Sequence, residues 1–182
     1  MSMPTRRATK IVATLGPASS DPALLEAMIR AGVNVVRLNF SHGKAQDHID
    51  RAATVRAAAQ RAGREVAIMA DLQGPKIRVG KFADGKVFLE PGAKFVLDAS
   101  RTEPGDINGV GLDYKELPRD VKAGDLLLLN DGLIVLTVDA VRGEEVHTTV
   151  KLGGELSNNK GINKQGGGLT APALTGKDMD DI

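Results

Sequence analysis

Two short polar segments carry side chains that could bind phosphate and carboxylate groups. One predicted strand runs into Arg37-Leu38-Asn39-Phe40-Ser41-His42-Gly43, and the next runs into Asp71-Leu72-Gln73-Gly74-Pro75-Lys76-Ile77-Arg78. In parallel α/β folds, ligands bind at the carboxyl ends of the strands, and neighbouring strands bring these ends to one edge. Arginine forks match the geometry of both phosphate and carboxylate. We therefore predict one rim for a phosphorylated, carboxylated substrate, formed by Arg37, Asn39, Ser41, Asp71, Lys76 and Arg78.

Each of these residues also has a simpler structural explanation. An arginine at a strand end often forms only a surface ion pair, as Arg37 would here. Asn39 and Ser41 have side chains that cap helices well, and a helix is expected directly after them. His42 by itself is typical of a loop, and Asp71 can brace a turn. The functional interpretation therefore requires that the predicted strands bring these residues close together.

Two more segments, further along the chain, are candidates. Asn130-Asp131-Gly132 is above all a signal for a hairpin turn. The loop from Ser157 to Asn163 is polar and contains Gly161, and its Lys160 either reaches a phosphate across an interdomain cleft or is simply solvated. The segment from Gly74 to Lys81 resembles a phosphate-binding loop, but it has one residue too many and Phe82 where serine or threonine is needed, so we reject it.

Before residue 72, apolar runs typical of strands alternate with segments in which apolar residues recur at helical spacing. These strands and helices are the elements that position the first two segments. Three apolar runs are expected strands, and two segments with helical spacing lie between them. Ser20-Asp21-Pro22 supplies the start of the first helix, and Gly32 and Gly63 supply the two ends. The second helix should bury a face made of Ile49, Ala52, Val55 and Ala59. The expected strands are Lys10–Leu15, Val33–Leu38 and Val66–Asp71, and the helices follow Asp21 and Lys44.

Apolar strands that alternate with helices predict a parallel sheet covered by helices. Two α/β architectures satisfy this pattern, a doubly wound sheet and a (β/α)8 barrel, and periodicity alone does not choose between them. A barrel needs eight strand–helix units and about 250 residues. Because only three such strands are found in 182 residues, we expect the chain to be a truncated piece of a larger barrel.

The pattern changes after Asp71. Short β-rich runs divided by turn pairs such as Pro91-Gly92 and Asp131-Gly132 predict a small antiparallel barrel or sandwich, without a convincing amphipathic helix. We expect it to be a second domain inserted after the third strand. The predicted boundaries are 1–76 for the first part of the barrel domain, 77–166 for the inserted β domain, and 167–182 for the return to the barrel. Thr175 and Asp178 form a possible capping pair for a last helix.

Composition excludes several classes of protein. Lys and Arg total 24 against 23 Asp and Glu, and this balance argues against nucleic-acid and membrane partners, which require surplus cations. The chain has no cysteine, which excludes disulfides, thiolate metal sites and cysteine nucleophiles. No apolar run approaches the roughly 20 residues of a membrane span. We expect a cytoplasmic globular protein.

The motifs together resemble those of pyruvate kinases, over essentially the whole chain. Lys10-Ile11-Val12-Ala13-Thr14-Leu15-Gly16-Pro17 is similar to the family's opening strand, and the two polar segments are similar to its N-terminal signatures. Asn130-Asp131-Gly132 and Lys160-Gly161-Ile162-Asn163 are similar to landmarks of its inserted domain. The resemblance implies a (β/α)8 (TIM) barrel with an inserted β-barrel lid. It also implies a glycolytic transferase, a kinase that moves the phosphoryl group of phosphoenolpyruvate to ADP and gives pyruvate and ATP.

The resemblance also implies roles for individual residues. Arg37 would contact the substrate phosphate, and Arg78 would share the catalytic work. The ADP/ATP-binding residues would be Asn39, Phe40, Ser41, His42, Arg78 and Lys160. The family's monovalent-cation pocket would consist of the Asn39 and Ser41 side chains, Asp71 and the Leu72 carbonyl. The family's magnesium ligands, and a lysine that assists proton delivery, would lie in later barrel strands. The parent enzyme would be a homotetramer, and this chain alone would be inactive.

One departure from the family pattern concerns potassium. Potassium-dependent members typically carry glutamate at the position of Lys76, and often threonine at the position of Leu72. An ammonium group can supply the positive charge that potassium supplies elsewhere. We therefore expect Mg²⁺ to be required and K⁺ not to be required.

Two alternative functions are open. One is another barrel enzyme that acts on phosphoenolpyruvate or a related keto acid, such as an aldol-type lyase, although such enzymes need no nucleotide lid. The other is a non-catalytic module that binds nucleotide or regulates a partner. Binding of magnesium–ADP distinguishes a module, which should bind it tightly, from an incomplete enzyme.

Overall fold

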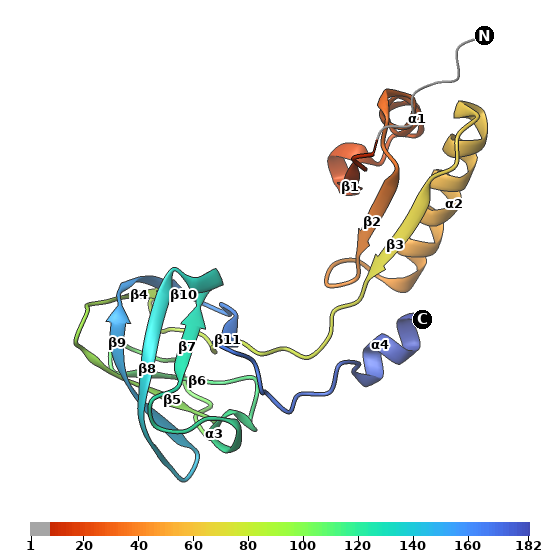
Figure 1. Ribbon diagram of the computed structural model, residues 1–182. Coiled ribbons are helices and arrows are strands. Elements are labelled where there is room, and N and C mark those ends of the chain that lie inside the picture. Colours follow the sequence, from red (N-terminus) through yellow and green to blue (C-terminus); the bar gives the residue numbers. More distant parts are fainter. Residues whose placement is uncertain (1–7) are drawn as a thin grey trace. The chain divides into compact units, whose positions relative to one another are not determined.

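The computed structural model describes residues 8–182, which divide into two compact units (Figure 1). The first, here called the α/β unit, comprises the chain up to Gly74 together with Leu174–Ile182. The second, the β unit, comprises Pro75–Ala173. No helix within residues 8–182 has the length and apolar character that crossing a membrane requires.

A three-stranded parallel sheet forms the centre of the α/β unit. Its strands are β1 (Val12–Thr14), β2 (Val35–Asn39) and β3 (Ala67–Asp71), in the order β1-β2-β3. The register pairs Thr14 with Arg37 and Asn39 with Asp71, so the polar residues at the strand ends share one edge. The parallel sheet expected from the sequence is therefore confirmed, with every strand end within two residues of its predicted position.

The helices of this unit begin and end where local chemistry favours it. In α1 (Pro22–Ala31), the Asp21 carboxylate accepts a hydrogen bond of 2.8 Å from the Leu24 amide, and Pro22 occupies the first position. Gly32 ends α1 with a φ of 125°. In α2 (Ala45–Ala62), the Asp47 carboxylate accepts from the Lys44 amide, and Gly63 ends the helix in the left-handed region. A short 3-10 turn, η1 (Pro17–Ser19), follows β1.

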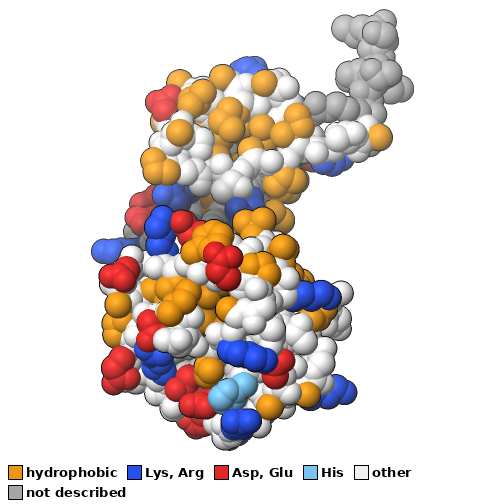
Figure 2. Space-filling view, turned by 90° about the vertical axis from the view of Figure 1, so that its left-hand side faces the viewer, with side chains coloured by type: hydrophobic (Ala, Val, Ile, Leu, Met, Phe, Trp, Pro, Cys, Tyr) orange, Lys and Arg blue, Asp and Glu red, His pale blue; other side chains and the backbone are white. Residues whose placement is uncertain are grey.

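The core of this unit lies between the two helices and β2. It is formed by Leu25, Ile29, Val33, Val36, Leu38, Val55, Ala58 and neighbouring residues. The outer strands are less covered than their apolar sequences suggest: Val12 is 52% and Met69 is 41% exposed. Apolar side chains accordingly gather on the visible surface of this unit, the upper part of Figure 2. One outer face of the sheet is thus left open, although strands of this composition are usually buried on both faces.

A short final helix, α4 (Gly176–Asp181), belongs to the α/β unit. Its start confirms the predicted capping pair, because the Thr175 hydroxyl accepts from the Asp178 amide while the Asp178 carboxylate accepts from the Thr175 amide. Asp178 is buried, and its other carboxylate oxygen accepts from the Gly74 amide at 3.0 Å. One side chain thereby ties the last helix to the segment that follows β3.

Replacing Asp178 by alanine should speed amide hydrogen exchange at Gly74 and Thr175, whose amides donate to the Asp178 carboxylate. Hydrogen bonds from the Thr175 hydroxyl and from the Thr175 and Gly74 amides hold the pKa of Asp178 below its ordinary value. Because the folded pKa is depressed, the interaction is complete above the ordinary carboxyl pKa of about 3.9 and is lost as the pH falls through the folded value. Wild-type protection at Gly74 should therefore also disappear in acid. The matched control is Asp180→Ala, since Asp180 is exposed on the same helix; equal exchange in both variants would contradict the assignment.

The β unit is built on a curled six-stranded sheet. Its strand order is β11-β7-β8-β9-β5-β6, antiparallel except for the β5–β6 pair, and β10 and β4 form a separate two-stranded ribbon. The strands are β4 (Lys86–Leu89), β5 (Lys94–Asp98), β6 (Gly109–Gly111), β7 (Leu126–Leu129), β8 (Ile134–Arg142), β9 (Glu145–Leu152), β10 (Gly154–Ser157) and β11 (Ile162–Lys164). A four-residue helix, α3 (Leu117–Asp120), precedes β7. Phe95, Leu97, Leu127, Leu136 and Leu156 are among the fully buried side chains of its core.

The predicted hairpin turn at Asn130-Asp131-Gly132 is confirmed. These residues form the short turn η2 (Asn130–Gly132) between the antiparallel strands β7 and β8. Asn130 and Asp131 have φ values of 50° and 58°, a region that asparagine, aspartate and glycine tolerate better than other residues. Charged residues of both signs are interspersed over the visible face of this unit, the lower part of Figure 2.

Contacts of residues 169–171 extend the β unit to Ala173, beyond the expected boundary at residue 166. Leu169 and Ala171 pack against the core of the β unit. The Asp120 carboxylate accepts hydrogen bonds from the Thr170 amide at 2.8 Å, the Thr170 hydroxyl at 2.9 Å and the Tyr114 hydroxyl at 2.6 Å. Burial raises the pKa of the Tyr114 hydroxyl, and the hydrogen bond to Asp120 adds to this effect.

Candidate functional site

Arg37, two residues before the end of β2, forms an ion pair with Asp71, the last residue of β3. Arg37 Nε donates to Asp71 Oδ2 at 2.9 Å, and Nη2 donates to the same oxygen. The remaining arm, Nη1, donates to the Thr14 hydroxyl at 3.1 Å. The guanidinium therefore joins all three strands of the sheet at one edge. It remains about one-third exposed, so part of its surface is open to a ligand.

The loop after β2 is held by a hydrogen bond to β3 and by hydrogen bonds within the loop itself. The Phe40 amide donates to the Asp71 carbonyl at 2.9 Å, which attaches the loop to β3. Asn39 Oδ1 accepts from the Ser41 amide at 3.0 Å, and Asn39 Nδ2 lies 3.4 Å from His42 Nδ1. Asn39 and Ser41 therefore order their own loop, and the start of α2 is instead capped by Asp47.

His48 is a positioning residue that the sequence analysis missed. Its ring stacks on Phe40 with centroids 4.1 Å apart, and its Nε2 lies 2.9 Å from the His42 carbonyl, to which it donates. His48 is buried, whereas Ile49, expected on the buried face of α2, is 60% exposed. That expectation was wrong by one position. His48 lies at helical spacing from Ala52, Val55 and Ala59 and therefore on the same face of α2. This spacing was the signal in the sequence that could have identified His48 as buried.

The oxygen atoms near Asn39 and Asp71 have the chemistry of a monovalent-cation site. Asn39 and Asp71 are paired in the sheet register; Ser41 lies two residues after Asn39, and Leu72 directly follows Asp71. Amide, hydroxyl, carboxylate and carbonyl oxygens are the donors that hard cations prefer. This set therefore fits such a cation, although in this structure Asp71 is engaged by Arg37 and Asn39 Oδ1 by the Ser41 amide. Within residues 8–182, no group of three or more His, Asp or Glu side chains is arranged to hold a metal ion.

Arg78 and Lys160 are brought together in the β unit by backbone pairing. Arg78 forms an antiparallel bridge with Gly161, and the Val79 amide donates to the Lys160 carbonyl at 2.9 Å. The Asn130 amide donates to the Gly161 carbonyl, so the turn η2 lies beside the same segment. The side chains of Arg78 and Lys160 have no hydrogen bond or ion pair with any residue from 8 to 182. Both cationic side chains are therefore without a partner in the described part of the chain.

The predicted site residues therefore form two groups, one on each unit. The α/β unit holds Arg37, the loop from Asn39 to His42, Asp71 and Leu72. The β unit holds Arg78 and Lys160, and also Lys76, which is exposed. The first group contains a guanidinium, whose fork matches phosphate or carboxylate, and the second contains Arg78 and Lys160, two cations without a side-chain partner among residues 8–182.

Comparisons with known proteins agree on one family. The family model for the barrel domain of pyruvate kinase matches residues 6–182. The chain is 58% identical over 177 residues to a pyruvate kinase of Haemophilus influenzae and 59% identical to pyruvate kinase II of Salmonella typhimurium. In both cases the match covers 97% of this chain and 37% of the relative, so the chain spans little more than a third of their length. Its structure is similar to a crystal structure of a pyruvate kinase from Cryptosporidium parvum, with a TM-score of 0.88 and 30% identity, covering 98% of this chain and 36% of that one.

Proposed function

The chain belongs to the pyruvate kinase family, and we propose that it forms the N-terminal part of an enzyme that transfers the phosphoryl group of phosphoenolpyruvate to ADP. We call that full-length enzyme the parent enzyme. The observation that carries the proposal is the anchored guanidinium of Arg37, which meets Asp71 and Thr14 at the carboxyl edge of the parallel sheet. Parallel α/β folds bind their ligands at this edge.

The proposed chemistry requires positive charge placed around a moving phosphoryl group. The bond between the phosphorus and the enol oxygen of phosphoenolpyruvate breaks, and a bond to a terminal phosphate oxygen of ADP forms. The enolate that leaves takes up a proton at carbon and becomes pyruvate. Charge spreads over the non-bridging oxygens during transfer, so catalysis consists mainly of positioning and electrostatic stabilisation. Arg37 binds the phosphate of phosphoenolpyruvate. Arg78 and Lys160 bind phosphates of the nucleotide, and residues 39–42 line the nucleotide site.

Mg²⁺, when bound, neutralises phosphate oxygens during transfer. Its protein ligands are proposed to lie in barrel strands beyond this chain, as the family resemblance implies. We therefore propose that the 182-residue chain alone does not catalyse the reaction. The parent enzyme is proposed to act as a homotetramer in the cytoplasm.

A coupled assay tests both statements. Pyruvate formed from phosphoenolpyruvate and ADP is reduced by lactate dehydrogenase, and the loss of NADH is followed. With the parent enzyme, NADH should be lost only when both substrates and Mg²⁺ are present, and the 182-residue chain should show no loss of NADH above the blank. A folded parent enzyme without turnover would overturn the proposed reaction, whereas turnover by the chain alone would overturn only its predicted inactivity.

Activity of the parent enzyme should be independent of potassium. Lys76 stands where potassium-dependent relatives carry glutamate, and its ammonium group is proposed to supply the charge that K⁺ supplies to them. The rate in a sodium or tetramethylammonium buffer should equal the rate after KCl is added at constant ionic strength. Lys76→Glu should make the enzyme depend on K⁺, with Lys81→Glu as a control for the charge change alone. Strict potassium activation of the wild-type enzyme would refute the proposal.

A second candidate function is a nucleotide-binding module. It is favoured by the position of Arg78 and Lys160, two unpaired cations on adjacent segments of one unit. Isothermal titration of the 182-residue chain with magnesium–ADP separates the alternatives. Tight binding that Lys160→Ala abolishes would support a module, and negligible binding would support an incomplete enzyme.

A further inference from the structure

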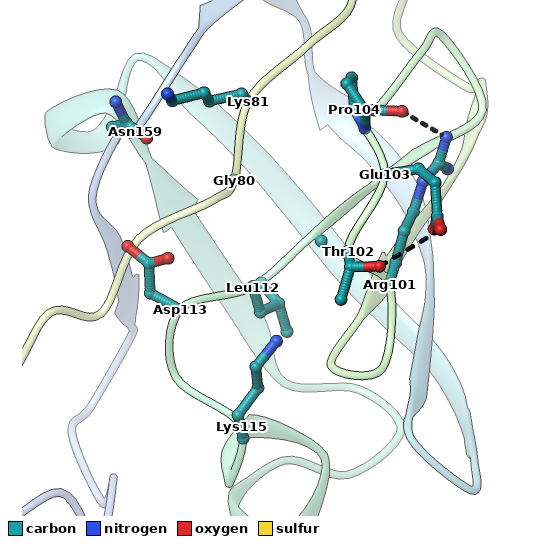
Figure 3. Close-up of a pocket in the computed structure, with 11 residues that line it drawn as sticks. Gly80, Lys81, Arg101, Thr102, Glu103, Pro104, Leu112, Asp113, Lys115 and Asn159 are labelled. Atoms are coloured by element: carbon teal, nitrogen blue, oxygen red, sulfur yellow. Dashed lines mark hydrogen bonds between the residues drawn. The ribbon is translucent and has the colours of Figure 1, made fainter.

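The β unit contains a hollow that none of the proposed substrate-binding residues lines (Figure 3). Its volume is about 350 Å³, within the range of pockets that bind small molecules. Three stretches of chain and one loop residue form its walls: Gly80 and Lys81, the loop 101–104, residues 111–115, and Asn159.

Backbone contacts hold these walls in place. The Gly80 amide donates to the Gly111 carbonyl at 2.8 Å, and the Asn159 amide donates to the Gly80 carbonyl at 3.1 Å. A Cβ atom added at Gly111 would lie 2.5 Å from the Arg101 carbonyl oxygen, so the chain passes here as closely as glycine permits. Arg101 donates to the carbonyls of Pro104 and Gly109, which closes its own loop. The hollow is therefore a preformed part of the fold.

The polar groups around the hollow are largely unused. Lys81 and Lys115 have no ion pair or side-chain hydrogen bond with any residue in the described part of the chain, and neither has the side chain of Asn159. In Figure 3, Lys81 extends beside Asn159 at one side of the hollow, while the ammonium group of Lys115 points towards Leu112 from the other. Asp113 lies between them at the edge. Three other lysines of the β unit pair with carboxylates, namely Lys86 with Glu155, Lys94 with Asp139 and Lys164 with Asp125, whereas Lys76, Lys122, Lys151 and Lys160 have no side-chain hydrogen bond or ion pair with any residue from 8 to 182.

These groups define the chemistry of a ligand. Two ammonium groups and one amide offer hydrogen-bond donors and positive charge from two sides, which suits a phosphate or carboxylate group. Arg101 does not add to this set, because its guanidinium is occupied by carbonyls. The carboxylates of Glu103 and Asp113 also line the hollow, so its lining is not purely cationic. Glu103 accepts a hydrogen bond from the Thr102 hydroxyl, whereas Asp113 has no side-chain partner among residues 8–182 and offers an acceptor for a hydroxyl group.

We propose that this hollow binds a small oxyanion, a phosphorylated or carboxylated metabolite that also carries a hydroxyl group, through Lys81, Lys115 and Asn159. The hydroxyl donates to Asp113. The site is independent of the proposed phosphoryl transfer, since it uses neither Arg37 nor the Arg78–Lys160 pair.

Amide chemical shifts of the ¹⁵N-labelled 182-residue chain test the proposal. Inorganic phosphate and, separately, malate are added at constant ionic strength, because screening by salt changes with each addition. The stronger of the two probes should produce saturable shifts at Gly80, Lys81, Asp113, Lys115 and Asn159, and its identity distinguishes a phosphate from a carboxylate source. Lys81→Ala/Lys115→Ala should raise the dissociation constant about tenfold or more, the effect of losing two charge-assisted contacts.

The matched control removes the same charge elsewhere. Lys122 and Lys151 are exposed lysines of the β unit without side-chain partners among residues 8–182, so Lys122→Ala/Lys151→Ala should leave the dissociation constant near its wild-type value. Equal weakening by both double variants would show diffuse attraction to net charge and would overturn the proposal. Absence of saturable shifts with either probe would also overturn it. Shifts confined to Arg78 and Lys160 would overturn this site while leaving the proposed function intact. If the double variant does not fold, Lys115→Gln provides the same comparison.

Discussion

Replacing Arg37 by alanine in the parent enzyme should lower kcat/KM for phosphoenolpyruvate by about 100- to 1,000-fold, the usual cost of removing one group that stabilises transition-state charge. The proposed contact to the substrate phosphate is lost, and Asp71 loses its ion-pair partner at the same edge. Repulsion between the free carboxylate and the phosphate adds to the effect. Arg37→Lys should restore only part of the activity, because a lysine cannot donate to Asp71, Thr14 and a phosphate with the fixed fork of arginine.

The control for this experiment is Arg30→Ala. Arg30 also pairs with a carboxylate, Glu26, but on the exposed surface of α1, where such pairs contribute about 0–1 kcal/mol or less. The kcat/KM of the Arg30→Ala enzyme for phosphoenolpyruvate should stay close to the wild-type value. The assignment of Arg37 to the substrate phosphate would be wrong if a folded Arg37→Ala enzyme retained wild-type kcat/KM.

Replacing Phe95 by alanine should lower the free energy of unfolding of the β unit by about 3–5 kcal/mol. Phe95 is completely buried on β5, in the core that also contains Leu127 of β7, Leu136 of β8 and Leu156 of β10. Its removal leaves a cavity that the surrounding strands cannot fill without breaking their register. Because domains of this size are stable by only about 5–15 kcal/mol, this loss should unfold a substantial fraction of the β unit near physiological temperature.

The chain offers both a probe and a control for that measurement. Tyr114 is its single tyrosine, there is no tryptophan, and Tyr114 is buried in the β unit, so intrinsic fluorescence during urea unfolding reports on this unit. Phe88→Ala removes the same side chain from β4, where it is 58% exposed, and should change stability by well under 1 kcal/mol. Equal urea midpoints for the two variants would contradict the description of the core.

The fold of the α/β unit was largely predictable because its signals are local. Asp21 with Pro22 marks a helix start, Gly32 and Gly63 mark helix ends, and three apolar runs mark the strands. In the β unit, the longer strands were predicted from β-rich runs between turn pairs. The short strands β6, β10 and β11 were not predicted, because their residues do not form β-rich runs and they exist through pairing with β5, β4 and β7.

The candidate site was predictable at the level of its segments but not of its contacts. Strand order alone placed Arg37 beside Asp71, since the ends of adjacent parallel strands meet. The stacking of His48 under Phe40 depends on the exact rotation of α2, and the spacing analysis misassigned it by one residue. The anchoring of Thr170 by Asp120 joins residues 50 positions apart and carries no local signal.

The most direct test of the central claim follows the phosphoryl group itself. Phosphoenolpyruvate, ADP and Mg²⁺ are incubated with the parent enzyme, and ³¹P nuclear magnetic resonance records where the phosphorus goes. If this chain supplies the phosphate-binding edge of a pyruvate kinase, the phosphoenolpyruvate signal is replaced by an equal amount of the γ-phosphoryl signal of ATP. Accumulation of inorganic phosphate instead, or an unchanged phosphoenolpyruvate signal with folded enzyme, would contradict that claim.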